Sequence, residues 1–211
     1  MDTWTCAGKG PATNVGKGWK TMNVTLSGDL GSGKTTLAAE LGERGWEVVS
    51  AGRAFRDEAV ARGLSLMELT ELCATDPTID AAIDARIAEL GERLDCAAFD
   101  SRLAFAVVPG ALRVWLSCPD DVAAKRVFDE RREGESFATV EEARESLARR
   151  RDMERERFVR AYGIDDRDPS CFDLVLDATR STCDLADELE ARVVDLGGDL
   201  PTLRRRRAVM R

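Results

Sequence analysis

The chain has 211 residues, a length that suits one domain with small insertions. Apolar residues make up 44% of it and charged residues 33%, a balance typical of a folded globular protein rather than a disordered one. The net charge of −8 argues against general nucleic-acid binding, because phosphate backbones select basic surfaces, and the longest apolar runs are far too short to span a membrane.

The first residues predict neither a signal peptide nor an ordered element. Residues 1–21 are rich in Gly, Lys, Thr and Asn and show no period, so we expect a disordered extension. Lysines occur there, but no apolar stretch follows them; this excludes a signal peptide, and we expect a cytoplasmic protein. Met22 directly precedes the first expected strand, and our hypothesis is that the natural chain starts there.

Strand and helix patterns alternate along the rest of the chain. We expect strands at residues 24–27, 46–50, 96–100, 112–117 and 172–177. We expect helices at residues 34–44, 54–61, 65–73, 79–94, from 119 onward, 140–162 and 185–196. Short strands alternating with helices indicate βαβ units, so the predicted fold class is α/β, with a parallel five-stranded sheet covered by helices on both faces.

A glycine-rich loop joins the first expected strand to the first expected helix. It matches G-x-x-x-x-G-K-[ST] at every fixed position, with the residues Gly28, Asp29, Leu30, Gly31, Ser32, Gly33, Lys34 and Thr35. Such a loop turns its N–H groups inward around phosphate oxygens, and the following helix adds its positive end, where Thr36 lies. We therefore expect ATP here, with Lys34 reaching the β- and γ-phosphates and the Thr35 hydroxyl as a Mg²⁺ ligand.

The chain lacks the residues that several other reaction types and protein classes require. Histidine is absent, which removes Ser-His-Asp and Cys-His catalysis, and the six cysteines form no CxxC pair that would predict a zinc site. A switch GTPase would need an NKxD-type motif, which this chain does not contain. A large ATPase would usually be longer and carry a long apolar strand ending in Asp-Glu. A small P-loop phosphotransferase remains as the best interpretation.

The organisation around that loop predicts three functional parts. We expect one P-loop kinase domain over residues 22–196, with a helical acceptor-binding insert at about 52–94. The polar segment at about 129–139 contains Gly134 and is predicted to be a mobile lid. Residues 197–211 form a basic tail, which we interpret as a solvated end of the chain, with incidental attraction to nucleic acid as the alternative.

Three further segments make the chain resemble the cytidylate kinase family. They are Ser50-Ala51-Gly52-Arg53-Ala54-Phe55-Arg56, Asp100-Ser101-Arg102, and the run from Arg150 to Arg157 that ends in Tyr162-Gly163-Ile164-Asp165. The similarity extends from about Val24 to Val194 and is strongest to the short, archaeal-type branch and related bacterial proteins. It implies a nucleoside monophosphate kinase fold and transfer of the ATP γ-phosphoryl group to a small acceptor, CMP or dCMP.

The resemblance also implies which residues bind the acceptor. Arg56 and Arg102 would hold its phosphate, with Gly52 beside them, and guanidinium groups suit that task because they bind phosphate as a bidentate fork. Arg150 and Arg157 would close over both nucleotides as catalytic residues, and Glu154 would contact the acceptor sugar. The spacings of four and three place these last three residues on one helix face.

Several residues in these segments have more than one possible role. Arg149 and Arg151 are alternatives to Arg150 and Arg157 after a small register shift, and an exposed helix with ion pairs is the alternative for the whole run. Asp100 is expected to orient the Mg²⁺ water shell or the acceptor, or else to cap a strand end. Arg180 follows the last strand and is expected to stack on adenine. Arg131 or Arg132 is expected to reach the ATP phosphates from the lid.

Two departures from the family pattern concern the base. Ala51 stands where many bacterial members have Ser, and Ser101-Arg102-Leu103 replaces a Gly-Arg-Asp triplet. In the family these positions help to read cytosine, so their replacement concerns the identity of the base rather than phosphoryl transfer. The alternatives are a related kinase for dephospho-CoA or another nucleoside monophosphate, and a non-catalytic nucleotide-binding regulator. We expect a monomer that binds small molecules, without nucleic-acid or membrane partners.

Overall fold

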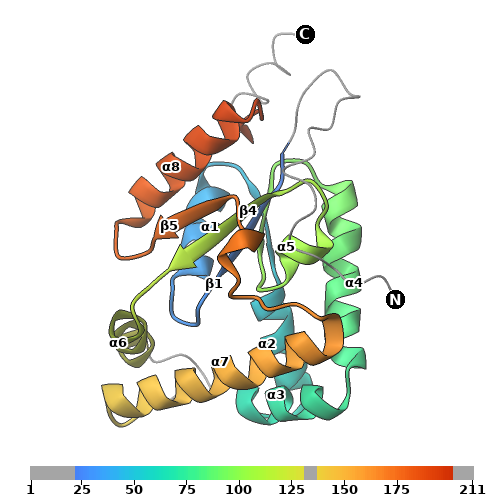
Figure 1. Ribbon diagram of the computed structural model, residues 1–211, viewed down its shortest axis with the longest axis vertical. Coiled ribbons are helices and arrows are strands. Elements are labelled where there is room, and N and C mark those ends of the chain that lie inside the picture. Colours follow the sequence, from blue (N-terminus) through green and yellow to red (C-terminus); the bar gives the residue numbers. More distant parts are fainter. Residues whose placement is uncertain (1–21, 131–136, 202–211) are drawn as a thin grey trace.

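The computed structural model describes residues 22–130 and 137–201, which form an α/β domain around one parallel sheet (Figure 1). The strand order is β2-β3-β1-β4-β5, and every described pairing is parallel. The strands are β1 (Val24–Gly28), β2 (Glu47–Ser50), β3 (Ala97–Asp100), β4 (Leu112–Ser117) and β5 (Leu174–Asp177). The predicted fold class is thereby confirmed.

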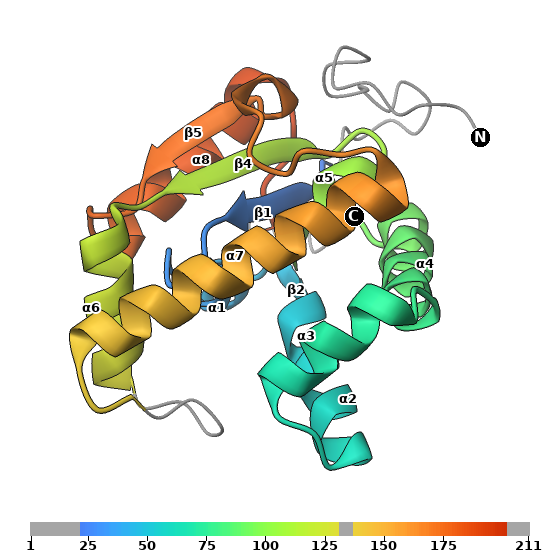
Figure 2. The ribbon, with the colours of Figure 1, turned by 60° about the horizontal axis from the view of Figure 1, so that its bottom comes forward.

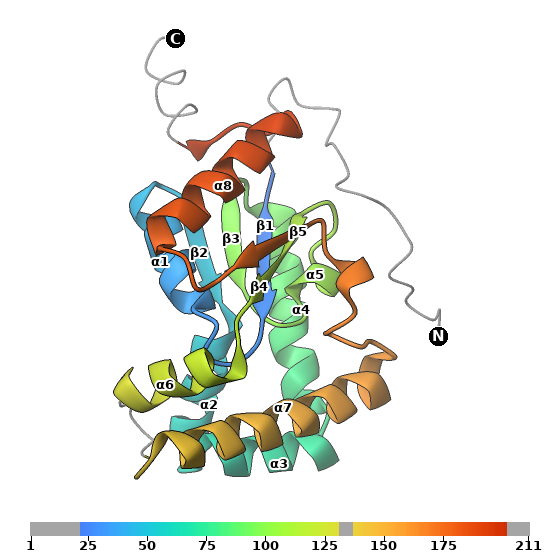
Figure 3. The same cartoon turned by 60° about the vertical axis from the view of Figure 1, so that its left-hand side comes forward.

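Helices connect the strands and fill both sides of the sheet. They are α1 (Lys34–Glu43), α2 (Ala51–Arg62), α3 (Leu66–Thr75), α4 (Thr78–Arg93), α5 (Ala104–Val107), α6 (Asp120–Glu130), α7 (Val140–Tyr162) and α8 (Thr182–Asp195), with a 3₁₀ turn, η1, at Pro169–Cys171. Helices α1 and α8 pack together on one face, and α4 and α5 lie on the other (Figure 3). Each face therefore has its own apolar layer.

The two layers are built from side chains that alternate along the central strands. Leu26 of β1 and Leu116 of β4 are fully buried against α1 and α8. On the opposite face, Phe99 of β3 packs with Ile87 of α4 and Val108. Because a buried Leu or Phe contributes roughly 2–3 kcal/mol of transfer free energy, these layers fix the strands that carry the site.

Four helices gather beyond the carboxyl edge of the sheet. Figure 2 shows α7 crossing this edge, with α6 at one of its ends and α2 and α3 on the side away from α6. Helix α7 contacts both α6 and α3. The strands β1, β2 and β3 end at this edge with Gly28, Ser50 and Asp100, whose strands are neighbours in register. Parallel sheets bind their ligands at this edge, so the site is expected there.

Most predicted element boundaries are confirmed to within two residues. Helix α8 begins three residues earlier than predicted, at Thr182 after the Ser181 cap, and two further differences also have a local cause. Helix α2 begins at Ala51, three residues earlier than predicted, because the Ser50 side chain caps it by accepting a hydrogen bond from the Arg53 N–H. The apolar run at 103–108 contains the short helix α5, which the sequence pattern did not reveal. Within the described ranges, no helix is both long and apolar enough to cross a membrane.

Parts of three predictions fall on residues that the structure does not describe. The expected N-terminal extension at 1–21 lies outside the described residues, as do 131–136 of the expected lid and 202–211 of the basic tail. These predictions therefore stay predictions.

Candidate active site

The glycine-rich loop takes the shape that its motif predicts. Gly28 has a φ of 138° and Gly31 a φ of 74°, both in the region that side chains disfavour. A Cβ at Gly28 would lie 2.6 Å from the Leu116 carbonyl oxygen, and one at Gly31 would lie 2.7 Å from that of Ala123. Only glycine fits these two close approaches. Helix α1 then begins at Lys34 with no acidic residue in its first turn, so its positive end is left for an anion.

The Lys34 ammonium group is folded onto the loop itself. Its Nζ donates to the carbonyl oxygens of Gly28 and Asp29, each at 2.7 Å. Removal from water lowers the pKa of Lys34 to about 8, and the nearby Arg102 cation adds to this effect. Phosphate oxygens would supply the negative charge that stabilises the ammonium form, which suits the predicted role of Lys34.

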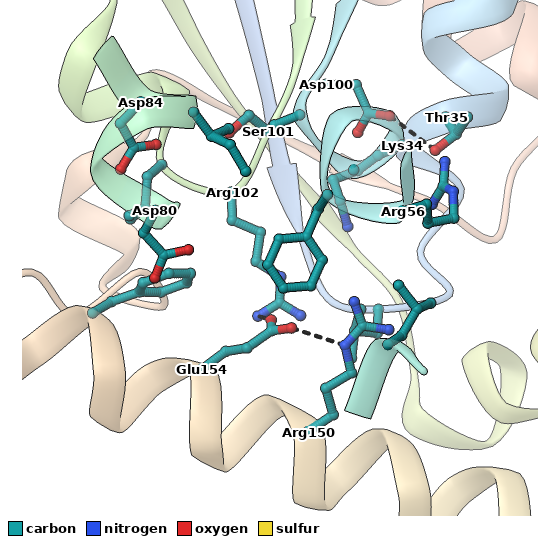
Figure 4. Close-up of a pocket in the computed structure, with 18 of the residues that line it drawn as sticks. Lys34, Thr35, Arg56, Asp80, Asp84, Asp100, Ser101, Arg102, Arg150 and Glu154 are labelled. Carbon is teal, nitrogen blue, oxygen red and sulfur yellow. Dashed lines mark hydrogen bonds and ion pairs between the residues drawn. The ribbon is translucent and has the colours of Figure 1, made fainter. Parts of the chain in front are cut away.

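Thr35 and Asp100 form the oxygen-rich part of the site. The Thr35 hydroxyl donates to Asp100 Oδ2 at 2.8 Å, and the Ser50 hydroxyl donates to the same oxygen at 3.1 Å. Asp100 thus joins the phosphate loop to the ends of β2 and β3 (Figure 4). Within the described parts of the chain no cluster of three acidic, Cys or His residues could hold a metal alone. A hydroxyl and one carboxylate nevertheless fit Mg²⁺, which takes most of its other oxygens from water and phosphate.

A first pocket lies on the α6 and α8 side of the loop. It is lined by Gly31, Ser32, Gly33, Thr36, Leu37, Arg126, Asp129, Glu130, Ala178, Arg180, Thr182 and Leu185. Arg180, the predicted adenine contact, is part of this lining and pairs with Glu188 at 2.5 Å. Arg126 was missed by the sequence analysis; it donates to the Ala178 carbonyl oxygen at 2.7 Å, and its Nη1 lies beside the loop, 3.7 Å from where a Cβ on Gly33 would be. We call this the donor pocket.

A second pocket lies on the other side of the loop, between it and helices α2, α4 and α7. Gly33, Lys34 and Thr35 line it together with the predicted acceptor residues Gly52, Arg56, Asp100, Arg102, Arg150, Glu154 and Arg157. We call this the acceptor pocket. The structure therefore brings together residues that lie more than 100 positions apart in the chain.

Arg102 is a cation of the acceptor pocket that two carboxylates hold. It pairs with Glu154, and its Nη1 lies 3.7 Å from Asp166 Oδ2. Its Nη2 is buried and has no hydrogen-bond partner. Arg56 on α2 also reaches the pocket, and no ion pair is found for it among the described residues. Both arginines therefore have donors available for an anion.

Glu154 holds two of the arginines in place. Arg150 Nε donates to its Oε1 at 2.9 Å, while Arg102 contacts the other oxygen (Figure 4). Burial alone would raise the pKa of Glu154, but Arg102, Arg150 and Arg157 together hold it below the usual value. The carboxylate stays ionised and aims two guanidinium groups at the pocket.

The register of the long helix α7 is settled by its ion pairs. Arg151 pairs with Asp120 of α6 at 2.8 Å, and Arg149 is exposed, whereas Arg150 lines the acceptor pocket. Arg157 lines it too, but its side chain is only 8% exposed and pairs with Asp80 at 3.0 Å. Its guanidinium also lies over the ring of Phe158 at 5.2 Å. Arg157 thus joins α7 to the insert, and its catalytic role stays a prediction.

Two acidic residues of the acceptor pocket were missed. Asp80 and Asp84 lie one turn apart on α4 and both line the pocket. The spacing of four next to the apolar residues Ile79 and Ile83 was the available signal, because it places two carboxylates on the edge of a buried helix face. Ala51 and Leu103, the two departures noted in the sequence, line the same pocket with apolar surface. Arg131 lies outside the described residues.

The fold and the two pockets that meet at one phosphate loop define a P-loop kinase of small molecules. A family model described as AAA domain matches residues 24–157. The chain is 39% identical over 160 residues to a cytidylate kinase of Methanocella arvoryzae, covering 75% of this chain and 89% of that protein. It is 35% identical over 184 residues to one of Methanococcoides burtonii, covering 84% and 99%. The chain belongs to the cytidylate kinase family.

Solved structures agree on the fold. A shikimate kinase of Bacteroides thetaiotaomicron superposes with a TM-score of 0.53 at 13% identity, over 81% of this chain and 99% of that one. At this level of identity the likeness concerns the arrangement of sheet and helices only.

Proposed function

We propose that this protein transfers the γ-phosphoryl group of MgATP to CMP or dCMP. The observation that carries the proposal is that Arg102 lines the same pocket as Lys34 and has a buried Nη2 without a hydrogen-bond partner. A buried cation with a free donor is stabilised by an anionic ligand, and a phosphate-bearing acceptor supplies one. The named activity of the relatives at 35–39% identity supports CMP as that acceptor.

The proposed mechanism is a direct in-line transfer in which the chain positions two polyanions. The loop N–H groups and Lys34 bind the donor phosphates, and Arg56 and Arg102 bind the acceptor phosphate. Arg150 lies between them and stabilises charge on the transferring group. Glu154 keeps Arg102 and Arg150 in place and contacts the acceptor sugar.

Mg²⁺ would be held by Thr35, with Asp100 orienting its water ligands. When bound, the ion neutralises charge on the β- and γ-phosphates. Asp100 also positions the Thr35 and Ser50 hydroxyls, which donate to it at 2.8 and 3.1 Å.

The remaining assignments complete this proposal. Residues 52–94 act as the acceptor-binding insert, and residues 129–139, with Arg131, act as a lid that excludes water from the reaction. We also propose that the protein acts as a monomer. We place it in the cytoplasm, where ATP and nucleoside monophosphates occur, with no nucleic-acid partner, because its net charge is −8.

The test is ADP release by the purified protein with MgATP and one acceptor at a time. The panel contains CMP, dCMP, UMP, AMP, GMP and dephospho-CoA. Strong stimulation by CMP or dCMP supports the proposal. Stimulation by another acceptor alone would keep the phosphate chemistry and refute the substrate. ATP binding without any acceptor-dependent turnover would instead support a nucleotide-binding regulator.

A further inference from the structure

The acceptor pocket has positively charged side chains at one end and carboxylates at the other. Lys34, Arg56 and Arg150 lie toward the phosphate loop, whereas Asp80 and Asp84 lie at the far end on α4 (Figure 4). Apolar side chains of Phe55, Leu66, Ile83, Leu103 and Phe158 line the pocket as well. A ligand that fits this arrangement is anionic at one end, flat and apolar in the middle, and carries a hydrogen-bond donor at the other end.

The two carboxylates at the far end differ in how they are partnered. Asp80 pairs with Arg157 at 3.0 Å, and this cation is itself fixed against Phe158. Asp84 has no ion pair within the described residues; the Tyr162 hydroxyl interacts with its carboxyl group. Its Oδ2 is buried and has no hydrogen-bond partner. Asp84 is therefore the carboxylate that has an acceptor atom left for a ligand.

An unpartnered buried carboxylate oxygen destabilises the ligand-free protein, so a ligand that donates a hydrogen bond to it is favoured. Leaving such an oxygen without a donor costs roughly 1–3 kcal/mol or more, and a ligand N–H group removes that cost. Burial also raises the pKa of Asp84, because the Tyr162 hydroxyl and the Arg157 cation only partly compensate the ionised form for the water that it has lost. Ala51 and Leu103 offer the base no polar side-chain atom from their positions in the same pocket.

We propose that Asp84 selects the base of the acceptor: its carboxylate accepts a hydrogen bond from the exocyclic amino group of an aminopyrimidine. Cytosine presents a donor at that position, whereas uracil presents a carbonyl oxygen, which the carboxylate repels. The inference rests on the proposed function, since it concerns the base of the same acceptor. Asp84 acts in specificity and takes no part in phosphoryl transfer.

The first test uses the unaltered protein and a substrate that lacks only the amino group. The 5′-monophosphate of the 2-pyrimidinone riboside is CMP with hydrogen in place of that group. We expect its kcat/KM to be roughly ten- to a hundredfold below that of CMP, with UMP lower still. Equal kcat/KM values for CMP and the analogue would overturn the inference, while leaving the proposed function intact.

The second test changes the carboxylate. Asp84→Asn keeps the shape and replaces one oxygen by a donor that uracil O4 can accept from, so the preference for CMP over UMP should fall at least tenfold. Glu89→Gln removes the same charge from an exposed site on α4 and should leave that preference unchanged. An unchanged preference in Asp84→Asn contradicts the inference. If this variant fails to fold, the analogue experiment alone decides. Failure of the unaltered protein to use any pyrimidine monophosphate would instead refute the proposed function.

Discussion

The donor pocket and the acceptor pocket share the phosphate loop but are built in different ways. In the donor pocket the loop glycines and the start of α1 supply backbone N–H groups, and its predicted base contact, Arg180, is 43% exposed. In the acceptor pocket buried side chains from α4, α7 and the end of β3 hold one another, as Glu154 holds Arg102 and Arg150. One side binds its nucleotide mainly through backbone geometry, and the other through a network of paired charges.

This difference predicts how each side responds to substitution. A backbone cradle depends on a few glycines and one lysine, so most changes in the donor pocket should have small effects. Removing one member of a buried charge network should reduce activity or stability more, because the charges of its partners are left uncompensated. The four substitutions below test this contrast, from the largest expected effect to the smallest.

Lys34 belongs to the phosphate loop on which both pockets border and lines the acceptor pocket itself, so its loss should affect turnover most. Lys34→Met should lower kcat by roughly a hundred- to a thousandfold or more, because it removes charge stabilisation that forms at the transferring group. The measurement is ADP release with MgATP and the preferred acceptor. Lys125→Met is the matched control, since Lys125 is exposed and pairs with Asp129 on α6. A Lys34 variant with normal turnover would remove the loop from the mechanism.

Arg157 tests the cost of breaking the buried network. Arg157→Met leaves Asp80 without its cation in a site where the two side chains are 8% and 12% exposed. We expect a loss of roughly 3–5 kcal/mol in the free energy of unfolding, measured by urea denaturation. Arg155→Met is the control on the same helix; Arg155 is 53% exposed and its partner Asp165 37% exposed, so the loss should stay below about 1 kcal/mol. Equal losses would show that the buried pair contributes no more to the free energy of unfolding than a surface pair.

The same contrast explains how much of the site the sequence could predict. The phosphate loop was predictable to the residue, because glycine spacing and one lysine encode a backbone shape that contacts elsewhere do not alter. The strands and helices followed from periodicity, and in the structure a capping box of Ser65 and Glu68 starts α3. The pairings of Glu154 and Asp80 were not predictable, because they depend on which turn of α7 faces which insert helix. Arg126 was missed because its contact with the Ala178 carbonyl depends on how α6 packs beside the end of β5.

Arg102 separates charge from geometry in the acceptor pocket. Arg102→Lys keeps the positive charge but loses the planar fork that contacts Glu154 and leaves Nη2 for the ligand. We expect kcat/KM for the acceptor to fall roughly ten- to a hundredfold, with the affinity for ATP unchanged. Arg113→Lys provides the control, since Arg113 is as buried and binds Asp173 with two hydrogen bonds far from both pockets. A parallel loss of ATP affinity would mean that the two pockets are not independent.

Arg180 should show the smallest effect, because the donor pocket depends least on its side chains. Its guanidinium is exposed and pairs with Glu188, so stacking on adenine is worth only about 0.5–1 kcal/mol. Arg180→Ala should therefore raise KM for ATP about two- to fivefold and leave KM for the acceptor unchanged. Arg86→Ala, which removes a similarly exposed arginine paired with Glu89 on α4, should change neither value. A rise in KM for ATP of more than about twentyfold would show that adenine is held by an ordered side chain, and the contrast between a backbone pocket and a side-chain pocket would then fail on the donor side.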